Sequence, residues 1–227
     1  YLHDRTRQGV ELMTHFDSSA GDTARVMAGI PALNSTFYWR LRFSVGDPAA
    51  LIEFPREVDG GQSILLLRDI EMERARKHAR VDRVGCPADY APEGGLSGDR
   101  ETATAQAVAQ CLKRHGIHHV IADRTLPLIY ADQIQKVGID VSCDIEWGVL
   151  QRRSKDEQEI ERLREAQQMT ENAMQMACEM IAGATAGRDG VLEVDGHTLT
   201  AERVRAAVDV FLLNRGYTNP TSIIAGG

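Results

Sequence analysis

The chain has 227 residues, of which 43% are hydrophobic and 26% are charged, and its formal net charge is -7. This composition is typical of a soluble globular protein and excludes disordered, collagen-like and disulfide-dense chains. Mild acidity argues against nucleic-acid binding, and no apolar run approaches the ~20 residues that a membrane span needs. The expected partners therefore include neither nucleic acid nor a membrane.

The cysteines indicate a reducing environment. Cys86, Cys111, Cys143 and Cys178 are far apart and form no CxxC motif. We therefore expect reduced thiols and a cytoplasmic location. The first residues contain no apolar stretch of the signal-peptide type.

The first 150 residues are predicted to form an α/β domain. A helix is expected over 1–16, a polar break over 17–23, and short strands over 25–28, 36–43, 50–54 and 63–67. Helices over 69–79, 102–115 and 126–137 then alternate with strands over 118–122 and 139–143. This alternation indicates a sheet that contains parallel strand pairs and carries helices on its faces.

Residues 151–227 are predicted to begin a second domain. The segment from Ser154 to Glu157 has the pattern of a capping box, and apolar residues then recur every three or four positions up to Gly183, which predicts one long helix. A loop or small hairpin is expected over 184–197, a helix from Thr200 to Gly216, and a strand over 221–225. These elements are too few to enclose a core. We therefore expect exposed apolar surface on the 154–182 helix unless a partner chain covers it.

Few residues are candidates for chemistry. The chain has no HExxH motif, phosphate loop or complete nucleophile elbow, and the neighbouring His118 and His119 point to opposite faces of a predicted strand. Tyr38, Trp39 and Arg40 are the candidate substrate-binding residues, and the alternative is that they pack structurally on the sheet. No catalytic residue and no metal ligand is assigned to any position.

Four segments carry a family resemblance. Residues 63–76 look like a strand followed by a Glu-x-x-Arg-Ala helix, and residues 115–141 look like the close of an N-terminal domain. Residues 152–166 are similar to an interdomain link with the first helix of a catalytic domain, and residues 199–227 to its second helix and first strand. In this order, the segments resemble the creatinase/aminopeptidase P/prolidase superfamily.

The resemblance implies both a fold and a function. The implied fold is a creatinase-type N-terminal α/β domain over 1–150, with a mixed sheet flanked by helices, followed by a truncated α+β pita-bread domain over 151–227. The implied function is that of the N-terminal part of an Xaa-Pro metallopeptidase of the aminopeptidase P or prolidase type, a hydrolase whose first domain makes oligomer contacts and gates the active site. The implied partners are short peptides with proline at the second position and further copies of the chain, in a homo-dimer or higher homo-oligomer.

The resemblance also implies a metal pair, but not on these residues. In the family, two divalent ions (Mn, Co or Zn) activate a water, polarise the scissile carbonyl and stabilise the tetrahedral intermediate. Their ligands include two Asp eleven positions apart, and no such pair occurs here. We therefore expect this segment alone to be inactive. Two alternatives remain open, namely a non-catalytic protein-binding module of the pita-bread type and a creatinase-type amidinohydrolase that works without metals.

Overall fold

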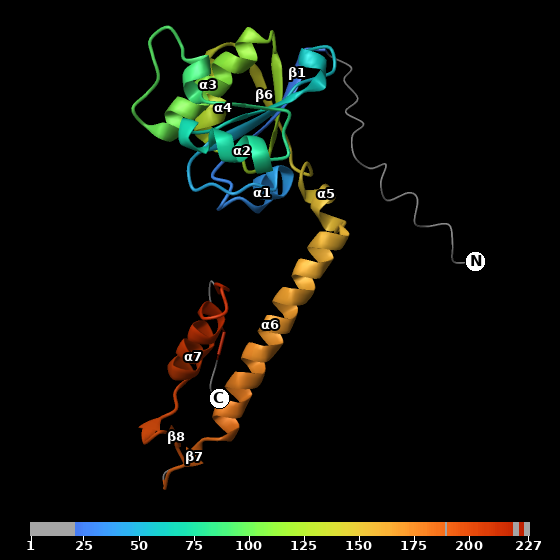
Figure 1. The fold of residues 1–227 in the computed structure, drawn as a ribbon. Coiled ribbons are helices and arrows are strands. Elements are labelled where there is room, and N and C mark those ends of the chain that lie inside the picture. Colours follow the sequence, from blue (N-terminus) through green and yellow to red (C-terminus); the bar gives the residue numbers. More distant parts are fainter. Residues whose placement is uncertain (1–20, 189, 220–222, 225–227) are drawn as a thin grey trace, which may run out of the picture. The chain divides into compact units, whose positions relative to one another are not determined.

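The computed structural model describes residues 21–188, 190–219 and 223–224, which form two compact units (Figure 1). Unit 1 ends at Ser154 and unit 2 begins at Lys155. The helix predicted over 1–16 lies outside the described residues. So does most of the strand predicted over 221–225, and its two described residues, Ile223 and Ile224, are not in a strand.

Unit 1 contains a six-stranded mixed sheet with the strand order β4-β3-β2-β1-β5-β6. The strands are β1 (Thr23–Gly29), β2 (Ala49–Glu53), β3 (Ser63–Leu66), β4 (Arg83–Gly85), β5 (His119–Asp123) and β6 (Asp140–Asp144). Strand β2 is antiparallel to both of its neighbours, whereas the pairs β1–β5, β3–β4 and β5–β6 are parallel. The predicted mixed sheet of an α/β protein is confirmed.

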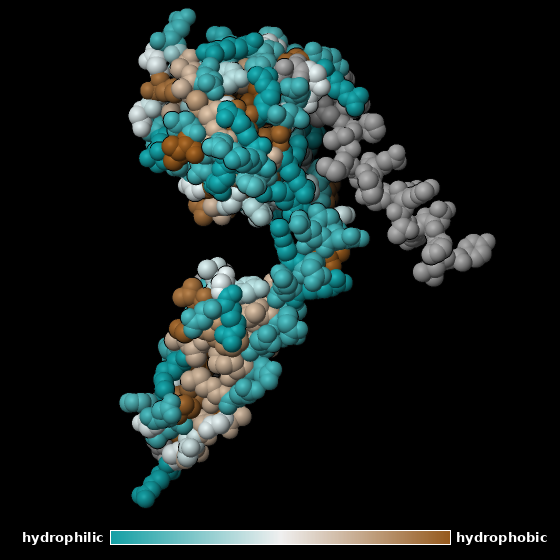
Figure 2. Space-filling view, viewed as in Figure 1, coloured by the Kyte–Doolittle hydropathy of each residue, from teal (hydrophilic) through white to brown (hydrophobic). Residues whose placement is uncertain are grey.

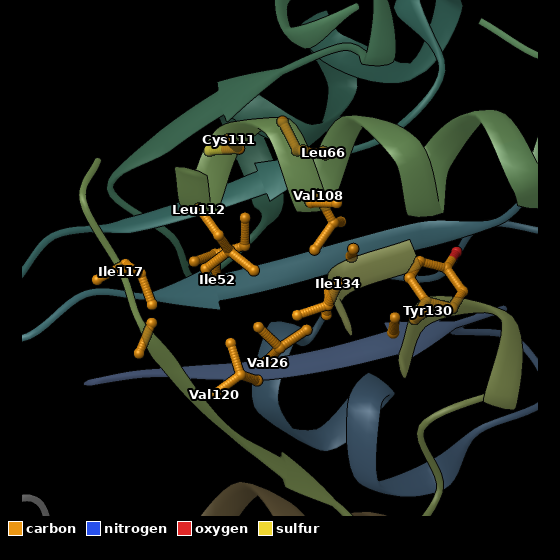
Figure 3. Packing of buried hydrophobic residues seen from close by; sticks show 14 of the residues in the cluster. Val26, Ile52, Leu66, Val108, Cys111, Leu112, Ile117, Val120, Tyr130 and Ile134 are labelled. Atoms are coloured by element: carbon orange, nitrogen blue, oxygen red, sulfur yellow. The ribbon is translucent and has the colours of Figure 1, made fainter. Parts of the chain in front are cut away.

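Helices cover both faces of this sheet. They are α1 (Ser35–Leu41), α2 (Met72–His78), α3 (Arg100–Arg114) and α4 (Leu128–Lys136). Unit 1 also contains helix α5 (Val149–Arg153), which contacts α1, and short 3-10 turns at Asp59–Gly61, Asp69–Glu71 and Pro87–Tyr90. Because side chains alternate along a strand, Val26 and Met27 of β1 enter different cores. Val26 packs with residues of α3 and α4 (Figure 3), whereas Met27 packs with Phe37 of α1 and Ala75 of α2. Each fully buried aliphatic side chain in these cores contributes ~1.5–3 kcal/mol.

The strand predicted over 36–43 is wrong, because Ser35–Leu41 form helix α1. Its β-branched and aromatic residues favoured a strand. Asn34 overrides that preference, since its Oδ1 accepts hydrogen bonds from two backbone N–H groups of the first turn, each at 3.1 Å. Arg42 closes the last turn with a left-handed φ of 52°. Local capping therefore decides this element against residue propensity.

Unit 2 contains two helices and a small antiparallel sheet. Its elements are α6 (Glu157–Ala182), β7 (Thr185–Ala186), β8 (Leu192–Val194), β9 (His197–Thr198) and α7 (Ala201–Leu213). The predicted end of the long helix at Gly183 and the cap of the second helix by Thr200 are confirmed. None of the helices in the described part of the chain is long and apolar enough to cross a membrane.

The predicted start of the long helix is wrong by two residues. Asp156 is the N-cap of α6, and its carboxylate accepts a hydrogen bond from the Glu159 N–H at 2.8 Å. The Glu159 side chain in turn accepts one from the Asp156 N–H at 3.1 Å. Ser154 instead ends α5, a helix that the sequence did not predict. The segment contains two overlapping capping-box sequences, one from Ser154 to Glu157 and one from Asp156 to Glu159. In the structure, the second of them forms the capping box.

Candidate functional site

The carboxyl edge of the sheet in unit 1 is the place where its topology can form a binding site. Strands β1, β3, β4, β5 and β6 all run in one direction, so their carboxyl ends lie along one edge. The neighbours β1 and β5 lead into α1 and α4, which pack on opposite faces. Open α/β sheets bind ligands at such a change of side.

A chain of hydrogen bonds links the ends of β1 and β5 at this edge. Asn34, after β1, donates from Nδ2 to the Thr125 hydroxyl at 2.7 Å. That hydroxyl donates to Oδ2 of Asp123, the last residue of β5, at 2.5 Å. Asp123 is only 2% exposed, and its Oδ1 has no hydrogen-bond partner among the residues that the structure describes. This part of the edge can therefore accept a further hydrogen bond.

Charged residues gather farther along the same edge. Asp47, just before β2, binds Arg68 after β3 with an Oδ2–Nη1 distance of 3.0 Å. Its other oxygen binds Arg100 at the start of α3, with an Oδ1–Nη1 distance of 2.9 Å. The hydrogen bond from Arg68, together with the charges of both arginines, lowers the pKa of Asp47 below its ordinary value. The carboxylate therefore stays ionised and neutralises part of the positive charge.

The three predicted substrate-binding residues are not brought together into a pocket. Tyr38, Trp39 and Arg40 are consecutive on helix α1, so successive side chains point about 100° apart rather than to alternate faces of a strand. Arg40 is engaged by Glu53, with a hydrogen bond from Nε to Oε1 at 2.6 Å. The Arg42 guanidinium lies 5.9 Å from the ring centroid of Trp39. Arg40 and Trp39 therefore have partners within unit 1, and contact of any of the three residues with substrate remains a prediction.

The described residues do not fit a metal centre. In the part of the chain that the structure describes, no group of three or more His, Cys, Asp or Glu residues could hold a metal ion. The four cysteines all lie in the described part of the chain, and none of them is in a disulfide bond. Cys111 lies 3.8 Å from Nδ1 of His115, but that nitrogen also lies 2.7 Å from the Cys111 carbonyl oxygen. A carbonyl only accepts, so Nδ1 carries the proton and is not a base for the thiol.

Sequence reasoning missed the residues of the carboxyl edge. The position of Asp123 could have been predicted, because it directly follows the strand predicted over 118–122. Binding residues of parallel sheets commonly stand at the carboxyl ends of strands. The pair between Asp47 and Arg100 had none, because the two residues are 53 positions apart. Only the packing of α3 against the sheet brings them together.

Comparison with known proteins identifies the fold. No family model matches the chain, and no curated protein matches it. Among solved structures, the Xaa-Pro dipeptidase from Bacillus anthracis has a TM-score of 0.61 at 14% identity, and the prolidase from Pyrococcus horikoshii OT3 a TM-score of 0.59 at 16% identity. The X-Pro aminopeptidase from Thermotoga maritima MSB8 has a TM-score of 0.53 at 15% identity.

The chain has the creatinase/aminopeptidase P/prolidase fold. Each of the three similarities covers 85% of this chain, but only 44–45% of the length of the matched structure. Unit 1 makes up about two thirds of the chain, so a match of that extent must continue into unit 2. The structural match therefore includes residues of both units.

Proposed function

We propose that this chain is the N-terminal part of an Xaa-Pro metallopeptidase of the aminopeptidase P or prolidase type. The observation that carries the proposal is the match over 85% of the chain to solved prolidase and Xaa-Pro peptidase structures. Because identities of 14–16% establish fold alone, the reaction is inferred rather than read from the residues. The substrates would be short peptides with proline at the second position.

The proposal assigns the hydrolytic chemistry to residues outside the described part. The described residues offer no ligand set for a pair of Mn, Co or Zn ions. Unit 1 would instead make contacts between copies in a homo-oligomer and restrict entry to the active site. Tyr38 and Trp39 are half-buried and Arg40 is paired with Glu53, so we propose Tyr38 and Trp39 ahead of Arg40 as peptide contacts. A cytoplasmic location is part of the same proposal.

An activity assay tests this function. The protein that carries this chain, extended to the length of the matched structures, is incubated with Mn²⁺ or Co²⁺ and then with an Xaa-Pro dipeptide or a longer Xaa-Pro-Yaa peptide. We expect cleavage of at least one peptide, with metal retained after gel filtration. Failure to cleave either peptide, with no metal retained, would contradict the proposal and favour a protein-binding module. Metal-free hydrolysis of a small guanidino compound would favour creatinase-type chemistry.

The 227-residue chain alone supplies the matched control. We expect no Xaa-Pro hydrolysis by it, with or without added metal, because no metal-ligand group is present among its described residues. Measurable cleavage by the isolated chain would show that the catalytic residues have been placed wrongly.

A further inference from the structure

Asp123 carries a buried acceptor that the described residues leave unused. One of its carboxylate oxygens, Oδ2, accepts hydrogen bonds from the Thr125 hydroxyl and from the Thr125 backbone N–H, at 2.5 and 3.1 Å. The other, Oδ1, is enclosed but meets no donor in the part of the chain that the structure describes. Buried polar atoms almost always have a partner, because a missing one incurs the full cost of desolvation. The open oxygen therefore indicates a donor from outside these residues.

A second carboxylate lies at the same level of the sheet. Asp144 is the register partner of Asp123 on the parallel neighbour β6, so the two side chains share one face, on strands about 4.8 Å apart. Oδ1 of Asp144 accepts hydrogen bonds from the N–H groups of Glu146 and Trp147, each at 3.0 Å. Its Oδ2 takes part in no hydrogen bond between described residues. Each of the two carboxylates thus has one oxygen without a donor from the described chain.

The negative charge of this pair favours a cationic ligand. Neither Asp123 nor Asp144 forms an ion pair with any residue that the structure describes. The basic residue of β1 on the same face, Arg25, lies with its guanidinium carbon 5.1 Å from the ring centroid of Trp147. Like charges on neighbouring strands repel each other, and burial weakens the screening of that repulsion by water. A cation between the carboxylates would remove this cost.

The available groups fit a primary ammonium better than a metal ion. Protein metal sites use three or more ligands, and no such group of His, Cys, Asp or Glu occurs among the described residues. An ammonium is a compact cation with three N–H donors. Two of them can meet the carboxylates of Asp123 and Asp144. The third can meet the Thr125 hydroxyl, which donates to Asp123, accepts from Asn34 and keeps one lone pair.

The location also suits a small polar ligand. Strands β1 and β5 are parallel neighbours, and the helices that follow them pack on opposite faces, which is where open α/β sheets bind ligands. Arg124 and Thr125, directly after Asp123, are exposed, so a local movement of the connection between β5 and α4 can admit a group to the enclosed oxygen. Figure 2 shows a mostly hydrophilic visible surface on unit 1, with apolar residues scattered among polar ones.

We propose that Asp123 and Asp144 bind the primary ammonium group of a small ligand at the carboxyl edge of unit 1. Two sources share this chemistry, namely a free small amine and the amino end of a short peptide. The peptide source rests on the proposed function, whose expected substrates carry such an amino end. The ammonium site itself does not depend on that function.

Matched salts test the site in the 227-residue chain. Methylammonium chloride and tetramethylammonium chloride supply the same charge, but only methylammonium has N–H donors. At equal ionic strength, we expect the chain to have a higher Tm in methylammonium than in tetramethylammonium, because a ligand of the folded state stabilises it. In a titration followed by ¹H–¹⁵N NMR, methylammonium should shift the signals of the Thr125 backbone N–H and the Asn34 side-chain amide. This titration also gives the Kd.

Three variants locate the binding groups. Asp123→Asn removes the charge and keeps the size of the side chain, and we expect it to raise the Kd for methylammonium about tenfold or more. Asp144→Asn keeps an acceptor for the two turn N–H groups and should raise the Kd by a smaller factor. It also tests the site independently if Asp123→Asn does not fold. The control Asp140→Asn removes a charge from an exposed residue of the same strand and should leave the Kd unchanged.

Two results would overturn the proposal. One is an equal effect of the two salts on the wild-type chain, which would leave a water molecule as the partner of Asp123 Oδ1. The other is a methylammonium affinity that persists in both Asp123→Asn and Asp144→Asn.

Competition experiments then distinguish the sources of the ammonium group. Displacement of methylammonium by Ala-Pro-Ala, but not by its N-acetylated form, would assign the site to peptide amino ends. Binding of methylammonium without displacement by either peptide would assign it to free amines. No readout depends on peptide cleavage, so an inactive longer protein would contradict the proposed function and leave the ammonium site standing.

Discussion

At the scale of single residues, Asp82 joins the starts of two neighbouring strands. Its Oδ2 accepts hydrogen bonds from the Ser63 hydroxyl at 2.7 Å and from the Ser63 backbone N–H at 2.8 Å. Ser63 is 6% exposed, so removing the carboxylate leaves a buried donor without its acceptor. We expect Asp82→Ala to lower the free energy of unfolding by about 1 kcal/mol at pH 7, since solvent screens the exposed carboxylate. Urea denaturation measures this difference.

The same pair of residues gives a pH dependence with a defined sign. The hydrogen bonds from Ser63 lower the pKa of Asp82 below its ordinary value of 3.8. The unfolded chain therefore takes up the proton first as the pH falls. We expect the stabilisation to be complete above about pH 5 and to be lost below pH 4, as the pH passes through the folded-state pKa. Asp140→Ala, at an exposed position, is the control variant. If the difference in unfolding free energy between wild type and Asp82→Ala were as large at pH 3 as at pH 7, the assignment would be contradicted.

Alanine substitutions at two glycines with left-handed backbones distinguish a steric clash from the energetic cost of the backbone conformation. Gly148 has a φ of +76°, and a Cβ there would overlap the methyl group of Thr36, whereas Gly138 has a φ of +83° and open space around it. Both alanine variants incur ~1–2 kcal/mol for the left-handed backbone, and only Gly148→Ala adds ~1–3 kcal/mol of overpacking. We expect Gly148→Ala to unfold at clearly lower urea concentration than Gly138→Ala. Equal midpoints would show that α1 moves aside freely.

At the scale of elements, helix α1 depends on its cap. Asn34→Ala removes the acceptor for two N–H groups and the donor to Thr125, so we expect a loss of about 1–2 kcal/mol of unfolding free energy. Asn34→Ser keeps a hydroxyl acceptor for the cap and removes the donor to Thr125 without adding a charge beside Asp123, and it should lose less. Chemical denaturation of the two variants checks the order. If Asn34→Ser were as damaged as Asn34→Ala, the bond to Thr125 rather than the cap would hold this segment.

The elements also show what the sequence could reveal. Periodic apolar residues and glycine stops located α3, α4, α6 and α7, because those signals are local. The segment that forms α1 was predicted as a strand, because its aromatic and β-branched residues favour strands. The N-cap Asn34 instead starts a helix there. Contacts between distant segments determine the strand order and the pairing of Asp47 with two arginines. They also determine the burial of Asp123 Oδ1. Local patterns do not encode those contacts.

At the scale of the whole molecule, the two units should differ in stability. Unit 1 has buried clusters on both faces of its sheet, whereas unit 2 has three buried side chains among its described residues. We expect amide hydrogens of α6 and α7 in the 227-residue chain to exchange well before those of β1 and β5. Native-state hydrogen exchange followed by mass spectrometry measures this. Equal protection of the two units would mean that they unfold together.

The position of β1 in the sheet also has a consequence for biosynthesis. Strand β1 pairs with β2, which follows it closely in the chain, and with β5, which begins only at His119. At ~5–20 residues per second, the ribosome needs roughly 5–20 s to deliver β5 after β1. During that interval the antiparallel partner β2 is available while the other edge of β1 stays unpaired. A nascent chain released before residue 119 is therefore an aggregation hazard and a natural client for a chaperone.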